Sequence, residues 1–292
     1  MSSFEQRINA FADKAEKWLR DASFSGADGQ KVVADAMNYS LMAGGKRVRM
    51  LLCDEFCRIC GGTDEMARSA ACAVEMVHTY SLIHDDLPCM DNDDFRRGMP
   101  SCHKAYGEAQ ALLAGDGLLT AAFELILSDE TLSYGTRTAL ACELAHAAGL
   151  KGMIGGQAVD ITPDADVTAD KLIRMYNMKT GAIISAACRM GCISVGADKM
   201  HIEAAGRYGI NLGAAFQIVD DILDIRGDEK LLGKPVNSDE KNCKPTYASL
   251  NGIDNAEISA RRYTESALTE LELFNDSAFI KEYTLQLLGR NK

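Results

Sequence analysis

Proline, tryptophan and strand-like alternation are scarce in this chain. It contains five prolines and one tryptophan in 292 residues, and apolar and polar residues almost never alternate over the length of a strand. Apolar residues instead recur at spacings of three and four, as in Phe4, Ile8, Phe11 and Ala15, which is typical of amphipathic helices. Because proline is the strongest helix breaker, its scarcity favours an all-α fold, which we expect to have about ten helices with short connections.

Long apolar runs and an excess of positive charge are also missing. The least polar stretch, residues 180–197, contains Arg189 and several small polar residues, which makes it too polar for a membrane span. Residues 1–21 mix acids and bases, unlike a secretory signal. Lys and Arg number 31 against 42 Asp and Glu, and the resulting net charge of −11 repels nucleic acid. We therefore expect a cytoplasmic protein with no stable membrane insertion and no nucleic-acid partner.

Glycine and polar residues mark the expected breaks between helices. The clearest breaks are residues 25–29, 61–64, 98–101, 149–156, 164–168, 196–199 and 227–245. None is long and rich in proline and serine, as a domain linker often is, so we expect one helical bundle domain over residues 1–292. The ten cysteines lie among apolar residues, which indicates reduced thiols rather than disulfides.

Two clusters of aspartate carry the strongest functional signal. The first follows an apolar helix and holds Asp85, Asp86, Asp91, Asp93 and Asp94. A charge run of this kind usually marks a solvated surface, so the first cluster alone is ambiguous. The second cluster is what lowers the weight of that interpretation.

The second cluster lies inside an apolar segment, where exposed acids are not expected. Asp220, Asp221 and Asp224 are three and four residues apart, so on a helix their carboxylates share one side. The first helix cannot continue regularly past Pro88, and we expect Asp91 to lie on a loop folded back toward Asp85. Two facing carboxylate clusters would hold Mg²⁺, with phosphate oxygens as the remaining ligands.

Basic residues near these clusters supply the other half of a phosphate site. They are Lys46, Arg47 and Arg49 in the Gly-Gly-Lys-Arg-Val-Arg stretch, Arg96 and Arg97 after the first cluster, and Lys179 and Lys234. A single Lys or Arg is usually only solvated. Their placement beside the acidic motifs favours binding of phosphate.

Taken in order, these motifs resemble those of the trans-isoprenyl diphosphate synthases, and especially the short-chain farnesyl and geranylgeranyl diphosphate synthases of bacterial and plastid type. The resemblance implies an all-α bundle around a deep central cavity, acting as a homodimer. It also implies that an allylic diphosphate, held by about three Mg²⁺ per active site, ionises to a cation that isopentenyl diphosphate attacks. Loss of a proton then gives the longer allylic diphosphate.

The resemblance also assigns roles to individual residues. The implied metal ligands are Asp85, Asp86, Asp91, Asp220, Asp221 and Asp224. Residues implied to bind the allylic diphosphate are Arg96, Lys179 and Lys234, and those implied for isopentenyl diphosphate are Lys46, Arg49, His78 and Arg97. Thr180 and Gln217 would face the developing cation with their oxygen dipoles.

Product length in this family depends on the helix that leads into the first motif. Tyr80, five residues before Asp85, resembles the aromatic residue of bacterial farnesyl diphosphate synthases, which predicts a C15 product. Helix geometry alone would place Ser81 beneath Asp85, so the choice of Tyr80 follows from the resemblance. Geranylgeranyl or geranyl diphosphate remains the alternative product. One departure is Asn237, where glycine is expected in the loop that closes over the site.

Four other interpretations stay open at this point. Cys53-x3-Cys57-x2-Cys60 has the spacing of a radical iron–sulfur site, although these cysteines lie in helical register. His84-Asp85 could be the metal doublet of a helical phosphohydrolase. Some relatives of the family are regulatory subunits, but these usually lose the aspartate motifs. A terpene cyclase would have no need of cations for a second diphosphate.

Overall fold

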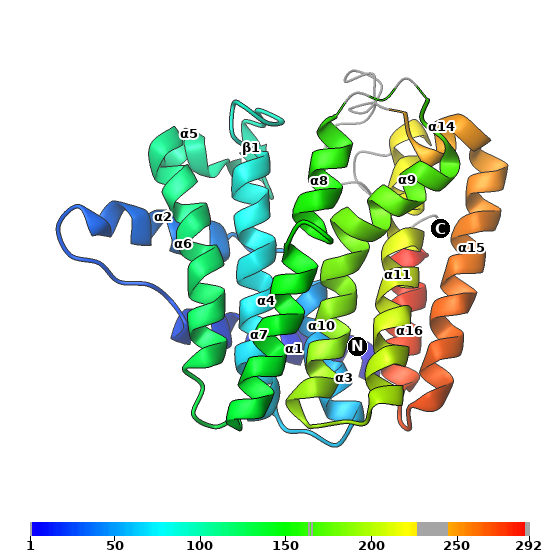
Figure 1. Cartoon of the computed structure of the whole chain (residues 1–292), viewed down its shortest axis with the longest axis horizontal. Coiled ribbons are helices and arrows are strands. Elements are labelled where there is room, and N and C mark those ends of the chain that lie inside the picture. The colour runs from blue at the N-terminus through cyan, green and yellow to red at the C-terminus, as the bar shows by residue number, and fades with distance from the viewer. Residues whose placement is uncertain (1, 163, 165, 227–244, 290–292) are drawn as a thin grey trace.

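Helices make up nearly all the regular structure of the computed structural model, which describes residues 2–162, 164, 166–226 and 245–289 (Figure 1). In the first half of the chain they are α1 (Ser3–Asp21), α2 (Gln30–Leu41), α3 (Val48–Ile59), α4 (Asp64–Asp85), α5 (Cys102–Tyr106), α6 (Glu108–Leu127) and α7 (Tyr134–Ala148). The second half contains α8 (Met153–Ile161), α9 (Ala169–Tyr176), the π-helix η1 (Asn177–Gly181), α10 (Ala182–Ser194), α11 (Lys199–Arg226), α14 (Tyr247–Asn251), α15 (Ile253–Glu270), the 3₁₀-helix η2 (Leu271–Leu273) and α16 (Ala278–Leu288). The expected all-α class is confirmed.

Short capping interactions explain where several helices begin. Ser2 and Glu5 form a capping box at the start of α1, and Ser133 and Thr168 accept backbone hydrogen bonds that begin α7 and α9. Each side chain satisfies an amide that the helix itself leaves unpaired. The break expected at residues 61–64 ends where α4 begins.

The break expected at residues 149–156 is too long. Gly155 and Gly156 lie inside α8, and they are glycine because neighbouring backbone comes very close. A Cβ at Gly155 would lie 1.8 Å from the carbonyl oxygen of Leu150, and one at Gly156 would lie 2.2 Å from the backbone nitrogen of Lys179. These two glycines permit close packing and do not break the helix.

One large buried hydrophobic cluster takes in residues from α1 through α16. Almost all of α10 is buried, which explains why the sequence is least polar there. The only strands in the described residues are β1 (Phe95–Arg96) and β2 (Met99–Pro100), which pair antiparallel. Within the same residues, only α6 is long and apolar enough to cross a membrane, and one third of its most apolar window (33%) is buried in the protein.

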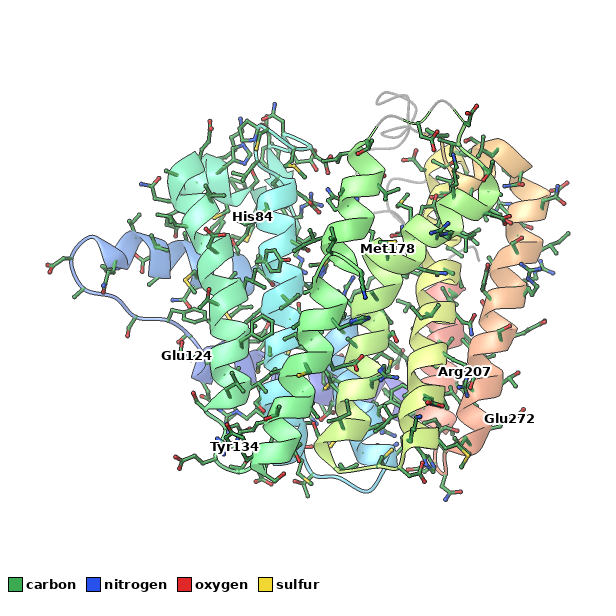
Figure 2. All side chains as sticks on the ribbon, in the orientation of Figure 1. His84, Glu124, Tyr134, Met178, Arg207 and Glu272 are labelled. Carbon is green, nitrogen blue, oxygen red and sulfur yellow. The ribbon has the colours of Figure 1, made fainter. Side chains whose placement is uncertain are left out.

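The carboxyl ends of α4, α8 and α11 lie at one end of the bundle, beside the β1–β2 hairpin and α14 (Figure 1). Asp85 is the last residue of α4 and the rest of the first cluster follows it, and Asp220, Asp221 and Asp224 lie in the last two turns of α11. Side chains of many kinds cover the outer faces of the helices (Figure 2). The chain thereby brings the two clusters to the same end of the molecule, as the proposed phosphate site requires.

Candidate active site

The first aspartate cluster folds back on itself at the end of α4. The backbone amide of Asp91 donates a 2.9 Å hydrogen bond to the carbonyl oxygen of Asp85, so the expected fold-back of the loop is present. Asp85 Oδ1 accepts a 2.9 Å hydrogen bond from Nε2 of Gln157 on α8. Burial raises the pKa of Asp85 to about 6, with Lys179 opposing the shift and Asp91 adding to it. Burial disfavours the ionised form of this carboxyl, and a cation bound beside it would stabilise that ionised form.

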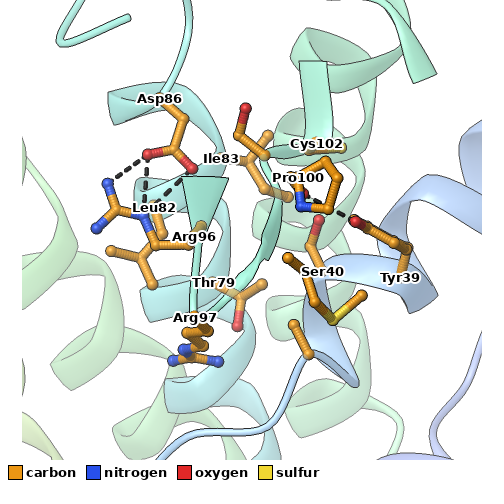
Figure 3. A pocket seen from close by; sticks show the side chains of 13 residues that line it. Tyr39, Ser40, Thr79, Leu82, Ile83, Asp86, Arg96, Arg97, Pro100 and Cys102 are labelled. Atoms are coloured by element: carbon orange, nitrogen blue, oxygen red, sulfur yellow. Dashed lines mark hydrogen bonds and ion pairs between the residues drawn. The ribbon is translucent and has the colours of Figure 1, made fainter. Parts of the chain in front are cut away.

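Two adjacent arginines of the β1–β2 hairpin, Arg96 and Arg97, have different partners. Arg97 and Gly98 form its turn with φ of 55° and 78°, the left-handed backbone that tight two-residue hairpins require. Arg96 Nε donates a 2.9 Å hydrogen bond to Asp86 (Figure 3). An Nη of the same guanidinium lies 3.0 Å from Asp93. A pocket of about 30 Å³ lies between these residues and α2, which has room for a water molecule or two but not for a diphosphate.

Below the hairpin, several cations surround one buried carboxylate. Glu75 on α4 is 1% exposed and accepts a 2.7 Å ion pair from Arg47, and Arg97 lies 3.9 Å from it. The Nε of Arg49 is buried without a hydrogen-bond partner among the described residues. Burial lowers the pKa of Arg49 to about 10, and burial and the neighbouring arginines hold the pKa of His78 well below its usual range. Positive charge exceeds negative charge here, which is what an anion site requires.

The loop before α3 brings backbone close to this cationic group. The guanidinium of Arg97 donates to the carbonyl oxygen of Gly44. A Cβ at Gly45, whose φ is +113°, would lie 2.9 Å from Arg97 Cζ, so glycine is required there for both space and conformation. Lys46, the next residue of the same loop, is exposed.

The π-helix η1 positions the next pair of predicted residues. Lys179 Nζ forms a 2.8 Å ion pair with Asp160 of α8, and the Thr180 hydroxyl donates to the side-chain oxygen of Gln217 on α11. Single-turn π-helices are frequent at functional sites, because the extra residue redirects neighbouring side chains. Thr180 and Gln217, which were predicted separately to face the cation, are thus in direct contact.

The second aspartate cluster is partly occupied by contacts within the protein. Asp221 is buried and accepts hydrogen bonds from the Tyr176 hydroxyl at 2.8 Å and the Tyr247 amide at 2.9 Å. Asp224 is buried and Asp220 is half-buried. In the described ranges, no three His, Cys, Asp or Glu side chains lie close enough together to hold a metal ion in this arrangement.

Tyr80, which is predicted to set product length, and its neighbour Ser81 lie on α4, one to two turns before the first cluster. Tyr80 is buried, with its ring edge-on to His84 at 5.6 Å between centroids. The Ser81 hydroxyl donates a 2.8 Å hydrogen bond to the carbonyl oxygen of His78. Lys234 and Asn237 lie outside the residues that the structure describes.

Three residues of this region were missed by the sequence analysis: Glu75, Gln157 and Asp160. Glu75 had a visible signal, because it is an acid in the apolar run Cys-Ala-Val-Glu-Met-Val. Gln157 and Asp160 are one helical turn apart, so they share one side of α8. Their partners could not be read from that spacing, because Asp85 is 72 residues away in the sequence.

The whole chain was then compared with known proteins. Residues 30–282 match the family model for polyprenyl synthetase. The chain belongs to the polyprenyl synthetase family. Its curated relatives include a farnesyl diphosphate synthase from Geobacillus stearothermophilus, 45% identical over 84% of this chain and 83% of the relative. A geranylgeranyl diphosphate synthase from Cyanophora paradoxa is 43% identical, with the same shares covered.

Solved structures agree with this assignment. The geranyltransferase of Legionella pneumophila superposes with a TM-score of 0.87 at 32% identity, covering 98% of this chain and 97% of that one. Membership makes this chain a short-chain trans-prenyltransferase of isoprenoid biosynthesis. The iron–sulfur interpretation has no support in the site, because Cys53 and Cys57 are buried within α3. The relatives are named for both farnesyl and geranylgeranyl products, so the names leave the product open.

Proposed function

We propose that this prenyltransferase condenses isopentenyl diphosphate with dimethylallyl or geranyl diphosphate to give (2E,6E)-farnesyl diphosphate and pyrophosphate. The observation that carries the proposal is a pair of separate charged groups. Carboxylates end α4 and α11 and would bind one diphosphate through metal ions, and buried arginines surround Glu75 and would bind a second diphosphate directly. Two diphosphates must be bound together for a condensation, whereas a hydrolase or cyclase needs only one.

The residues of the first site would bind the allylic diphosphate and favour its departure. Lys179 is held by Asp160 at 2.8 Å and can point its ammonium at a departing diphosphate. Thr180 and Gln217 are linked by a hydrogen bond, and their oxygen dipoles would stabilise the allylic cation without a charge that could capture it. The buried apolar side chains of α4 and α10 would exclude the water that quenches such a cation.

Residues of the second site would hold isopentenyl diphosphate beside that cation. Arg49 has a buried Nε with no hydrogen-bond partner in the described part of the chain. Arg97 lies close to it, and Lys46 is exposed on the loop before α3. We expect an Arg49→Gln variant to raise the KM for isopentenyl diphosphate at least about tenfold, because it removes a charge-assisted hydrogen bond. The KM for geranyl diphosphate should change much less. Equal changes in both would argue against two sites.

The residues present fit magnesium. The number of Mg²⁺ ions per active site, about three, is part of the proposal. The set is all carboxylate, which suits a hard cation, and burial has raised the pKa of Asp85 to about 6. Asp85 and Asp91 on one side and Asp220 and Asp224 on the other would hold it. When bound, the metal would neutralise charge on the diphosphate leaving group.

The C15 product rests on Tyr80. Its buried ring one to two turns before Asp85 would close the floor against a longer chain. We expect Tyr80→Met and Tyr80→Ala to shift the product from C15 toward C20, measured by chromatography of the dephosphorylated alcohols. Ser81→Ala is the matched control on the neighbouring position and should leave C15 dominant. An unchanged product in both Tyr80 variants would remove Tyr80 from this role.

A homodimer is also part of the proposal. Leu112, Leu113 and Leu127 of α6 are about half exposed, and an exposed apolar face of this kind supports association. The charged variant Leu113→Glu should produce a smaller species by light scattering than the wild type at the same concentration. A monomeric wild-type protein at micromolar concentration would contradict this part.

A further inference from the structure

Two cysteines meet at the end of the bundle opposite the aspartates. Cys60 is the C-terminal cap of α3 and Cys192 lies in the last turn of α10. Their Sγ atoms are 3.7 Å apart. Cys60 is partly exposed and Cys192 is buried, so one thiol can be reached from solvent while the other lies behind it.

The backbones of α3 and α10 pack closely beside the two cysteines. A Cβ at Gly191, next to Cys192, would lie 2.3 Å from the carbonyl oxygen of Cys53 and 2.8 Å from the amide of Cys57. A Cβ at Gly62, just after Cys60, would lie 2.2 Å from a methyl of Val195. A disulfide needs an S–S distance of about 2.05 Å, so the two sulfurs, now 3.7 Å apart, must approach by about 1.6 Å.

The surroundings of Cys60 also favour reaction. The contact with Cys192 lowers the pKa of the Cys60 thiol and His201 adds to this effect, which together outweigh the partial burial and the Asp198 charge that raise it. His201 is oriented by Asp198, 2.8 Å from its Nδ1. Burial raises the pKa of Cys53 and Cys57, and the contact with Cys60 together with burial raises the pKa of Cys192. Cys60 is therefore the thiol of this group that forms the reactive thiolate most readily.

We propose that Cys60 and Cys192 form a reversible disulfide that joins α3 to α10 when the protein meets a small-molecule disulfide such as oxidised glutathione. The Cys60 thiolate attacks one sulfur of the oxidant, its S–S bond breaks, and the first glutathione leaves as a thiolate that takes up a proton. The Cys192 sulfur then attacks the Cys60 sulfur and releases the second glutathione with a proton. Two protein thiols are oxidised, one glutathione disulfide is reduced to two thiols, and both protons leave with them.

This bridge would act on stability and not on the chemical step. It closes a long loop of chain between α3 and α10, which restricts the unfolded state. The C-terminal ends of α3 and α10, which carry the two cysteines, lie at the opposite end of the bundle from the C-terminal ends of α4 and α11 (Figure 1). The melting temperature of the oxidised protein should therefore exceed that of the reduced protein by about 5 °C, with kcat unchanged within about twofold.

The test is to equilibrate the full-length protein over a series of glutathione redox ratios, alkylate the remaining thiols and map the peptides by mass spectrometry. A peptide containing Cys60 should be joined to one containing Cys192, and dithiothreitol should separate them. C60S, C60A and C192S should each abolish this joined peptide and the redox-dependent rise in melting temperature. C142S is the matched control, because Cys142 is exposed on α7, and it should retain both.

Two results would overturn the proposal. One is recovery of the Cys60 and Cys192 peptides unlinked, as free or glutathione-capped thiols, even at the most oxidising ratio. The other is a linked peptide with no rise in melting temperature, which would show that the bridge does not stabilise the native bundle. Neither result depends on substrate turnover, so the prenyltransferase proposal stands or falls separately.

Discussion

Glu75 offers the sharpest test of the second anion site. It is a carboxylate with 1% of its surface exposed, paired with Arg47 at 2.7 Å and with Arg97 3.9 Å away. Glu75→Gln keeps the shape of the side chain and removes only the charge. The arginines would then be buried without their counter-ion, while the loop and helices around them keep the same packing.

The expected magnitude follows from the burial of the pair. Removing one partner of a buried ion pair typically costs about 3–5 kcal/mol, because the remaining charge is left uncompensated. For a chain of 292 residues, that cost lowers the melting temperature by about 5–8 °C. Glu75 also repels any diphosphate bound among the same cations. At a separation of about 10 Å and an effective dielectric of about 20, this repulsion is about 1.7 kcal/mol, or more than about tenfold in affinity.

Two opposite effects are therefore expected from one substitution. Unfolding in urea should show the lower stability, and calorimetric titration with pyrophosphate should show tighter binding to Glu75→Gln than to wild type. Adding pyrophosphate should raise the melting temperature of the variant more than that of wild type. Glu65→Gln, an exposed acid in the first turn of the same helix, is the control and should change stability by less than about 0.5 kcal/mol. A stability loss below about 1 kcal/mol, or weaker pyrophosphate binding in Glu75→Gln, would refute the reasoning.

Three further predictions concern packing and protonation. In Gly156→Ala, the new Cβ would collide with the Lys179 backbone at 2.2 Å; we expect a loss of about 2–3 kcal/mol in urea unfolding and a drop in kcat of at least about tenfold. Burial and nearby arginines hold the pKa of His78 low. Below about pH 6.5, His78 is therefore protonated in the unfolded chain but not in the folded chain, and the folded state loses stability as the pH falls. Wild type should then lose up to about 1.4 kcal/mol per pH unit more than His78→Gln as pH falls below about 6.5. Tyr176→Phe removes a 2.8 Å hydrogen bond to the buried Asp221 and should lower the unfolding free energy by about 1.5–3 kcal/mol.

Matched controls exist for two of these. Gly135→Ala on α7 meets its nearest neighbour only at 3.9 Å, and it should be neutral or slightly stabilising. Tyr134→Phe removes a hydroxyl from a side chain that is 80% exposed and should leave stability unchanged. Destabilisation by Gly135→Ala as large as that by Gly156→Ala would mean that the close approach of η1 is not the cause. A flat difference between wild type and His78→Gln from pH 7 to 5 would contradict the low pKa of His78.

Local patterns predicted the helices and the aspartate end of α4 well. The spacing of Phe4, Ile8 and Phe11 gives the buried face of α1, and Pro88 correctly predicts a loop that returns Asp91 to Asp85. These features depend on neighbours within a few residues, where helix periodicity and proline geometry decide the outcome.

Features that depend on residues distant in the sequence could not be predicted from local patterns. Gly155 and Gly156 look like a break in the sequence, but they lie within α8. They are glycine because the backbones of Leu150 and η1 leave no room for a side chain there. The π-helix itself has no local signature in Asn177–Gly181, since the extra residue is accommodated by packing around it. The role of Glu75 likewise depends on arginines from two other segments of the chain.

The central claim is elongation of one diphosphate by another, and the direct measurement is product length. Purified protein is incubated with Mg²⁺, labelled isopentenyl diphosphate and geranyl diphosphate, and the products are dephosphorylated and separated by chain length. The account predicts a C15 alcohol as the main product and none without added Mg²⁺. A C20 main product would contradict the role of Tyr80, and no elongation at all would contradict the proposed condensation.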